Sequence, residues 1–273
     1  MSAQTAPLVD DFGRTVTYLR VSVTDRCNVR CVYCMPPEGV PTLSHDDMLS
    51  YEDIADFVRV AVDRGIDKVR LTGGEPLVRK GIVALVEMLA RIEGIRDLSM
   101  TTNGILLASL AGRLAAAGLH RVNVSLDALD PERYAAITRG GEVRHVIEGI
   151  HAAVAAGLTP IKLNCVVAQS SQEQDARAVA EFGRQHGFEV RFIHRMSLAA
   201  GRFQRVEGGE GGWCERCNRL RLSSTGLLRP CLFNDRTFDI RTMGNEAALD
   251  AAVRAKPRSG TASKHNHMHE IGG

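Results

Sequence analysis

The stretch TYLRVSVTDRCNVRCVYCMP, residues 17–36, carries the two features on which the fold prediction rests. Its first part, Thr17–Val23, is rich in β-branched and apolar residues, which predicts a buried strand. Its second part places three cysteines in a loop directly after that strand. A helix should follow, because Ser50 is a suitable N-cap and apolar residues recur three and four positions apart up to Gly65.

The same strand-then-helix unit repeats along the chain to about residue 196. Such alternation predicts parallel strands with helices outside them. We therefore expect an α/β fold in the form of a partial (β/α)6 TIM-like barrel, with an open doubly wound sheet as the alternative. The further expected strands are Lys68–Thr72, Asp97–Thr101, Arg121–Ser125, Ile161–Val167 and Glu189–His194, and the further helices are Gly81–Arg91, Leu106–Ala117, Val143–Val154 and Gln174–His186.

Composition and charge exclude several classes of protein. Hydrophobic residues make up 44% and charged residues 24% of the 273, and the formal net charge is +2. Such a chain is globular and has no overall field that attracts nucleic acid or a membrane, so we expect neither as a partner. No apolar run approaches the ~20 residues of a membrane-spanning helix. The first residues do not resemble a secretory signal, so we expect a cytoplasmic protein.

Three regions follow from these patterns. We expect a core over residues 1–196, a Gly-rich linker over 197–213, and a small C-terminal segment over 214–273. The last 18 residues, from Lys256, are expected to form a mobile tail. Six of the seven cysteines fall into two groups, which in a reducing compartment indicates metal sites. Cys165 stands alone in a predicted strand and should be a buried core thiol.

The first cysteine group, Cys27, Cys31 and Cys34, supplies three thiolates within eight residues. Three protein ligands on a four-iron cubane leave one iron open to a small molecule. The spacing, with Tyr33 before the last cysteine, resembles the signature of the radical S-adenosylmethionine (SAM) superfamily, in which SAM occupies that iron. The alternatives are a zinc site, although zinc usually takes four ligands, and three unrelated cysteines. The GGEP motif at residues 73–76 favours the cluster, because its glycines let carbonyls approach a ligand and its carboxylate suits an ammonium.

The second group, Cys214, Cys217 and Cys231, also has three members, and Arg219 and Arg221 follow closely after Cys217. This pattern predicts a second open cluster beside two cations, in a small C-terminal iron–sulfur segment. The alternative is a zinc ribbon completed by a histidine near the C-terminus. The candidate histidines are His265, His267 and His269.

Longer motifs make the resemblance more specific. TDRCNVRCVYCMP, VRLTGGEPLVR, TTNG, VNVSLDAL, CNRLRLSSTGLLRPCLF and the terminal IGG resemble the GTP 3′,8-cyclase family, which begins molybdopterin biosynthesis. The resemblance covers residues 15–196 and 213–241 and the last few residues. Two departures stand out: the segment between Met196 and Cys214 is several tens of residues shorter than in the family, and His194–Arg195 replaces an acidic–aromatic pair.

The resemblance implies a role for each matching position. The SAM cluster would be held by Cys27, Cys31 and Cys34, and the auxiliary cluster by Cys214, Cys217 and Cys231. The SAM pocket would be lined by Tyr33, Gly74, Glu75, Ser125 and Met196. GTP would be bound by Arg20, Arg70, Thr101, Lys162, Arg191, Arg219 and Arg221. The terminal Gly272 and Gly273 would reach into the active site.

The resemblance also implies the reaction and its participants. GTP would be converted to 3′,8-cyclo-7,8-dihydro-GTP by a radical, made from SAM, that takes the ribose C3′ hydrogen. Two 4Fe–4S clusters and SAM would be the cofactors, an electron donor such as flavodoxin or ferredoxin would supply reducing power, and a homodimer is expected. Cations on barrel strands agree with this, because they are costly to bury without an anion and Arg suits bidentate phosphate contacts. Strand alternation could instead turn them outward.

Two other functions fit parts of the sequence. A radical SAM enzyme acting on a peptide or another small molecule would use the second cluster as an electron relay. A non-catalytic iron–sulfur or zinc scaffold would need neither the GGEP motif nor a SAM pocket.

Overall fold

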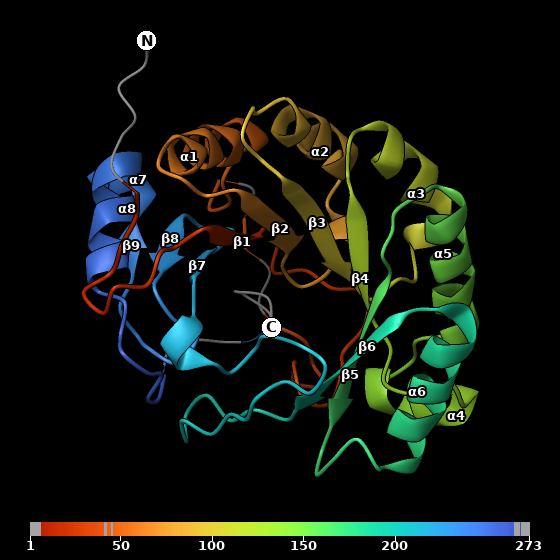
Figure 1. Ribbon diagram of the computed structural model, residues 1–273. Coiled ribbons are helices and arrows are strands. Elements are labelled where there is room, and N and C mark those ends of the chain that lie inside the picture. Colours follow the sequence, from red (N-terminus) through yellow and green to blue (C-terminus); the bar gives the residue numbers. More distant parts are fainter. Residues whose placement is uncertain (1–6, 41–42, 45, 265–267, 269–273) are drawn as a thin grey trace.

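The computed structural model describes residues 7–40, 43–44, 46–264 and 268. Its nine strands form one sheet in the order β6-β5-β4-β3-β2-β1-β7-β8-β9. The sheet curves into an arc with helices on its outer side (Figure 1). Neighbours from β6 through β7 are parallel, whereas β8 and β9 pair antiparallel. The described strands do not close into a full ring, so the expected α/β partial barrel is confirmed.

The strands and helices up to β6 lie within two residues of the expected bounds. The strands are β1 (Tyr18–Ser22), β2 (Lys68–Thr72), β3 (Asp97–Thr102), β4 (Arg121–Ser125), β5 (Lys162–Val167) and β6 (Glu189–His194). The helices are α1 (Tyr51–Asp63), α2 (Ile82–Ala90), α3 (Leu107–Ala116), α4 (Pro131–Thr138), α5 (Val143–Ala155) and α6 (Gln174–His186), with a 3₁₀ turn at Pro76–Val78. Only α4 and the 3₁₀ turn were not expected. As expected, α1 begins at Ser50, which forms a capping box with Asp53.

The C-terminal segment extends the sheet instead of standing apart from it. It contributes β7 (Arg219–Leu222), β8 (Leu227–Arg229), β9 (Phe238–Asp239), α7 (Ile240–Met243) and α8 (Asn245–Arg254), and a 3₁₀ turn at Cys214–Arg216. β7 pairs with β1, the first strand of the chain. The expectation of a mobile tail from Lys256 is wrong for the described part, because Lys256 is 3% and Ser263 is 1% exposed. Packing against the sheet holds this segment in place.

The two faces of the strands have different partners. Leu19 and Val21 on β1, with Val69 and Leu71 on β2, belong to the core beneath the outer helices. Side chains in a strand alternate between faces, so Arg20 points to the inner side of the arc. The fold thus directs apolar residues outward to the helices and leaves the inner face for polar groups. No described helix has the length and apolar character needed to cross a bilayer.

Two helical glycines test the packing of α3 on α5. A Cβ on Gly149 of α5 would overlap the carbonyl oxygen of Gly104, whereas a Cβ on Gly112 of α3 would meet nothing within 4 Å. Alanine is favoured over glycine in a helix by about 0.8–1 kcal/mol. We expect Gly112→Ala to raise the free energy of unfolding by up to about that amount. Gly149→Ala should instead lower it by about 1–3 kcal/mol through overpacking.

Urea unfolding of both variants, without clusters, measures these differences. Equal effects of the two substitutions would contradict the close approach of α5 to the Gly104 turn.

Candidate active site

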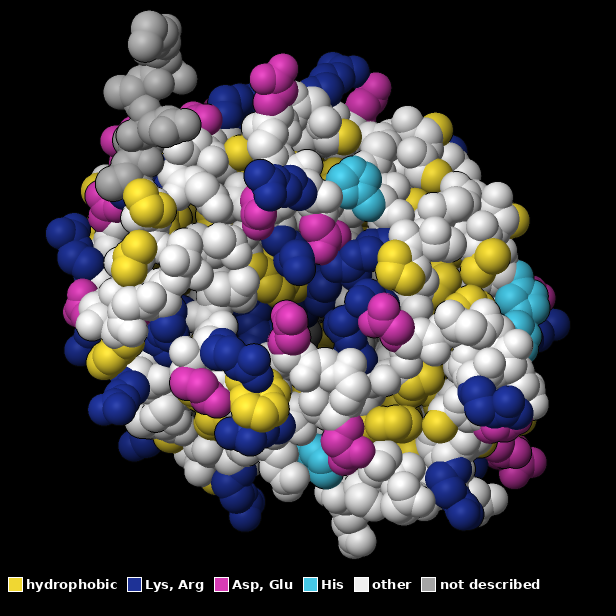
Figure 2. Space-filling model, in the orientation of Figure 1, with side chains coloured by type: hydrophobic (Ala, Val, Ile, Leu, Met, Phe, Trp, Pro, Cys, Tyr) yellow, Lys and Arg dark blue, Asp and Glu magenta, His cyan; other side chains and the backbone are white. Residues whose placement is uncertain are grey.

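Strand register concentrates arginines on the inner face of the sheet. Arg20 on β1 is directly opposite Arg70 on β2 and Arg221 on β7. These three line one cavity together with Arg191 and Arg219. Figure 2 shows Lys and Arg side chains gathered around a hollow near the middle of this face of the molecule. Burial and the nearby Arg219 lower the pKa of Arg221 to about 10. The cavity is therefore suited to a polyanion.

The second cysteine group lines this same cavity. Cys214, Cys217 and Cys231 lie beside the arginines although Cys231 is 14 positions from Cys217 in the sequence. Burial acts to raise the pKa of the Cys217 thiol, but the charges of Lys256 and Arg219 outweigh it and lower the pKa to about 6. Cys217 is thus favoured as a thiolate, the form that binds metal.

The first cysteine group lines a neighbouring cavity. Cys27, Cys31 and Cys34 surround it, and the Tyr33 hydroxyl beside them donates to Asp127 Oδ2 at 2.6 Å. Burial, with the charge of Asp127, raises the pKa of Cys31 to about 12. Burial likewise raises the pKa of Cys34 to about 11. These thiols therefore need a metal to be deprotonated at neutral pH.

The GGEP motif packs closely against the backbone of the cysteine loop. A Cβ on Gly74 would overlap the carbonyl oxygen of Arg26, and one on Gly73 would overlap that of Thr24. Glu75 is fully buried and does not line the cavity. Its carboxylate accepts from the Asn103 and Leu77 backbone N–H groups at 2.6 and 3.0 Å and from the Thr102 hydroxyl at 2.7 Å. The motif thus ties the ends of β2 and β3 to the loop.

The two cavities adjoin, because Asn164, Ile193 and Met196 line both. Asn164 lies on β5 and Ile193 on β6, and Met196 follows β6. A molecule bound at the first cysteine group would therefore share a wall with one bound among the arginines. Sequence reasoning singled out only Met196. The polar Asn164, two residues after Lys162 in an otherwise apolar strand, was the available signal for an inward-facing position.

The remaining site residues that the sequence predicted differ in which cavity they line, and some line neither. Tyr33, Gly74 and Ser125 line the first cavity. Thr101, expected at GTP, also lines this first cavity, and its hydroxyl has no hydrogen-bond partner among the described residues. Lys162 lines neither cavity and pairs with Glu189 at 2.6 Å. The expected positions that fall outside the described residues are Gly272, Gly273, His265, His267 and His269.

The linker that sequence reasoning left without a role forms part of the arginine-lined cavity. Phe203, Gln204 and Val206 line it, as does the stretch from Gly209 to Trp213. Glu207 in this linker bridges back to Phe192 of β6. The short linker therefore forms part of the cavity wall next to β6.

The arrangement of the cysteine groups is compatible with iron–sulfur clusters. Among the described residues, no three Cys, His, Asp or Glu side chains converge closely enough to hold one metal ion. A single zinc ion requires such convergence, whereas a cubane takes one thiolate on each of three separate irons. All seven cysteines are free thiols, so both groups can act as ligands.

Comparison with known proteins agrees with this geometry. The model of the Radical SAM superfamily matches residues 21–183, and that of Molybdenum Cofactor Synthesis C matches residues 165–270. The fold is shared with SuiB of Streptococcus suis (TM-score 0.60, 15% identity, covering 89% of this chain and 67% of that one). It is also shared with methylornithine synthase (TM-score 0.54, 15% identity, covering 66% and 54%). The chain is thus a member of the radical SAM superfamily.

Relatives with curated names identify the family within this superfamily. The GTP 3′,8-cyclase of Thermodesulfovibrio yellowstonii is 42% identical over 90% of each chain, and that of Geobacter sulfurreducens is 40% identical over 97% of this chain and 99% of its own. The chain therefore belongs to the GTP 3′,8-cyclase family, as its motifs predicted. The Geobacter alignment spans 324 positions against the 273 residues here, so at least 51 aligned positions have no counterpart in this chain.

Buried Glu75 should make stability depend on pH. Burial raises its pKa from 4.5 to about 7 despite the hydrogen bonds to the carboxylate. The folded protein therefore holds this proton more tightly than the unfolded chain, and the contribution of Glu75 to stability falls as pH rises from about 4.5 to 7. The free energy of unfolding of the wild type relative to Glu75→Gln should drop over this window by up to about 3 kcal/mol.

Urea unfolding of both cluster-free proteins at several pH values checks this expectation. A difference between the two that stays constant from pH 4.5 to 7 would contradict the raised pKa.

Proposed function

We propose that this chain is a radical SAM GTP 3′,8-cyclase that converts GTP to 3′,8-cyclo-7,8-dihydro-GTP in molybdopterin biosynthesis. The observation that carries the proposal is the pair of adjoining cavities, each with its own cysteine trio and one with five arginines. A scaffold protein needs no such cavities. A triphosphate supplies the negative charge that the arginines are placed to bind.

The residues divide the work between the two cavities. Cys27, Cys31 and Cys34 hold a 4Fe–4S cluster, which when bound supplies the electron that cleaves SAM. Cys214, Cys217 and Cys231 would hold the auxiliary cluster, which would contact the guanine. The arginines fix the triphosphate, so that the ribose is presented at the wall formed by Asn164, Ile193 and Met196. Holding the two reactants in place across one wall is the protein's main contribution.

Some parts of the proposal concern the protein beyond this site. Residues 1–196 form the SAM-binding core, 197–213 the linker, and 214–273 the auxiliary-cluster segment. The proposal also includes a role in the reaction for Gly272 and Gly273, which lie outside the described residues. The enzyme works in the cytoplasm, receives electrons from a flavodoxin or ferredoxin, and forms a homodimer. Thr101, whose hydroxyl has no hydrogen-bond partner among the described residues, joins the GTP-binding set, and Lys162 joins it by exchanging Glu189 for the nucleotide.

Anaerobic assay tests the function directly. The reconstituted protein is incubated with dithionite, SAM and GTP, and products are analysed by mass spectrometry. We expect 5′-deoxyadenosine together with the cyclised nucleotide. Formation of 5′-deoxyadenosine without consumption of GTP would support another substrate, and absence of both products would overturn the assignment to SAM chemistry.

Two arginines provide a matched test of the anion site. Arg191 lines the cavity, whereas Arg184 is 73% exposed on α6 and pairs with Glu181. A hydrogen bond to a charged group contributes about 1.5–3 kcal/mol, and each 1.4 kcal/mol is tenfold. Arg191→Leu should therefore lower kcat/KM for GTP about tenfold or more, while Arg184→Leu leaves it unchanged. Equal kinetics for both variants would place the triphosphate elsewhere.

A further inference from the structure

A buried lysine makes hydrogen bonds to two separate segments of the second cysteine group, the one at Cys217 and the one at Cys231. Lys256, which follows α8, donates from Nζ to Cys217 Sγ at 3.4 Å, to the Arg219 carbonyl oxygen at 2.7 Å and to the Pro230 carbonyl oxygen at 3.1 Å. An ammonium has three donor hydrogens, and each finds one acceptor here. Pro230 directly precedes Cys231, so Lys256 joins the segment at Cys217 to the segment at Cys231.

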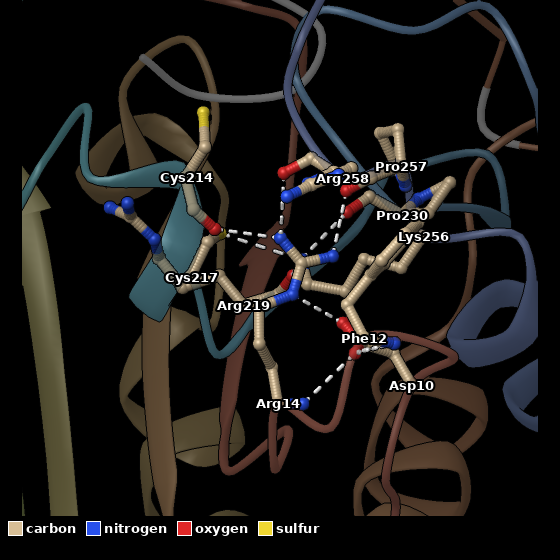
Figure 3. A network of polar contacts seen from close by, with 10 residues as sticks. All are labelled: Asp10, Phe12, Arg14, Cys214, Cys217, Arg219, Pro230, Lys256, Pro257 and Arg258. Atoms are coloured by element: carbon tan, nitrogen blue, oxygen red, sulfur yellow. Dashed lines mark hydrogen bonds and ion pairs between the residues drawn. The ribbon is translucent and has the colours of Figure 1, made fainter.

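A buried arginine from the other end of the chain holds the third cysteine. Arg14 Nη1 donates to the Cys214 carbonyl oxygen at 2.6 Å and to that of Arg258 at 3.1 Å, and Nη2 donates to that of Pro257 at 2.7 Å. Figure 3 shows the guanidinium between the Cys214 turn and the segment that carries Lys256. Arg14 therefore contacts the same segment, residues 256–258, that carries Lys256.

The orientation of Arg14 is itself fixed. Asp10 Oδ2 accepts from Arg14 Nε at 2.6 Å, and Asp10 Oδ1 accepts from the backbone N–H groups of Arg14 and Phe12, both at 3.0 Å. The Asp10 side chain is fully buried and that of Arg14 is 8% exposed. A buried ion pair with these extra hydrogen bonds has one well-defined geometry.

We propose that Arg14 and Lys256 are positioning residues that hold the three auxiliary cysteines in the arrangement a 4Fe–4S cluster needs, and that Lys256 also tunes the reduction potential of that cluster. The inference rests on the proposed function in one respect, that Cys214, Cys217 and Cys231 bind a cluster. Partners of the ligands commonly set both the affinity and the potential of a metal site. A positive N–H donor at a ligand sulfur stabilises the more negative, reduced state.

The test isolates the second cluster. A parent protein with Cys27→Ala, Cys31→Ala and Cys34→Ala lacks the SAM cluster, so iron and electron paramagnetic resonance report only the auxiliary site. Into it we place Lys256→Met, or Arg254→Met as the matched control from the exposed face of α8. Iron per chain, the rate of iron loss to a chelator, and the midpoint potential against dithionite are measured anaerobically.

The two cations should give different signatures. Lys256→Met should lose iron about tenfold faster or more and shift the potential to more negative values. Arg14→Met should also speed iron loss but leave the potential near that of the parent, because Arg14 contacts a carbonyl oxygen rather than a sulfur. Arg254→Met should match the parent in all three readouts.

Several outcomes would overturn the proposal. A Lys256→Met protein with the iron loss and potential of the parent shows that Lys256 is only a packing residue. If Lys256→Met does not fold, Lys256→Gln, which keeps an N–H donor without the charge, decides by the same readouts. A parent that binds no iron overturns the auxiliary cluster itself and the inference with it, whereas GTP turnover has no influence on any of these results.

Discussion

The parallel register of β7, β1 and β2 is the constraint on which the site depends. It sets Arg221, Arg20 and Arg70 side by side on the inner face of the sheet. Burial, together with repulsion from the neighbouring Arg221 and Arg70, lowers the pKa of Arg20 well below its ordinary value. A bound triphosphate would offset both effects. The hydrogen bonds between these three strands thus hold the sheet together and also place the arginines side by side.

The same register determines how the two cysteine groups are separated. Cys27 comes after the carboxyl end of β1, whereas Cys217 comes just before the amino end of β7. Because these neighbouring strands are parallel, the groups lie toward opposite ends of the inner space. A strand of five residues spans about 16 Å at 3.3 Å per residue, so the two groups are separated along the sheet by roughly the length of β1. This explains why a site of two clusters needs β7 beside β1, and why the C-terminal segment joins the main sheet.

Much of the fold and of the candidate site could be predicted from the sequence, because long periodic patterns specify the helices and strands that they form. The alternation up to β6 and both cysteine trios were evident from spacing alone. The strands β7, β8 and β9 were missed because they have four, three and two residues, too few for a periodic signal. Pairing of Lys162 with Glu189 depends on the register of β5 against β6, which sequence does not display. Lys256 was assigned to a tail because its partners are 26 to 39 residues away in the chain.

The central claim is that the inner arginines bind the phosphates of the substrate. Anaerobic calorimetry with the reconstituted protein and SAM, titrated with GTP and separately with guanosine, measures this most directly. The account predicts binding of GTP that weakens with added salt and at least a hundredfold weaker binding of guanosine, because only GTP reaches the arginines. Guanosine binding as tightly as GTP, with no effect of salt, would contradict it.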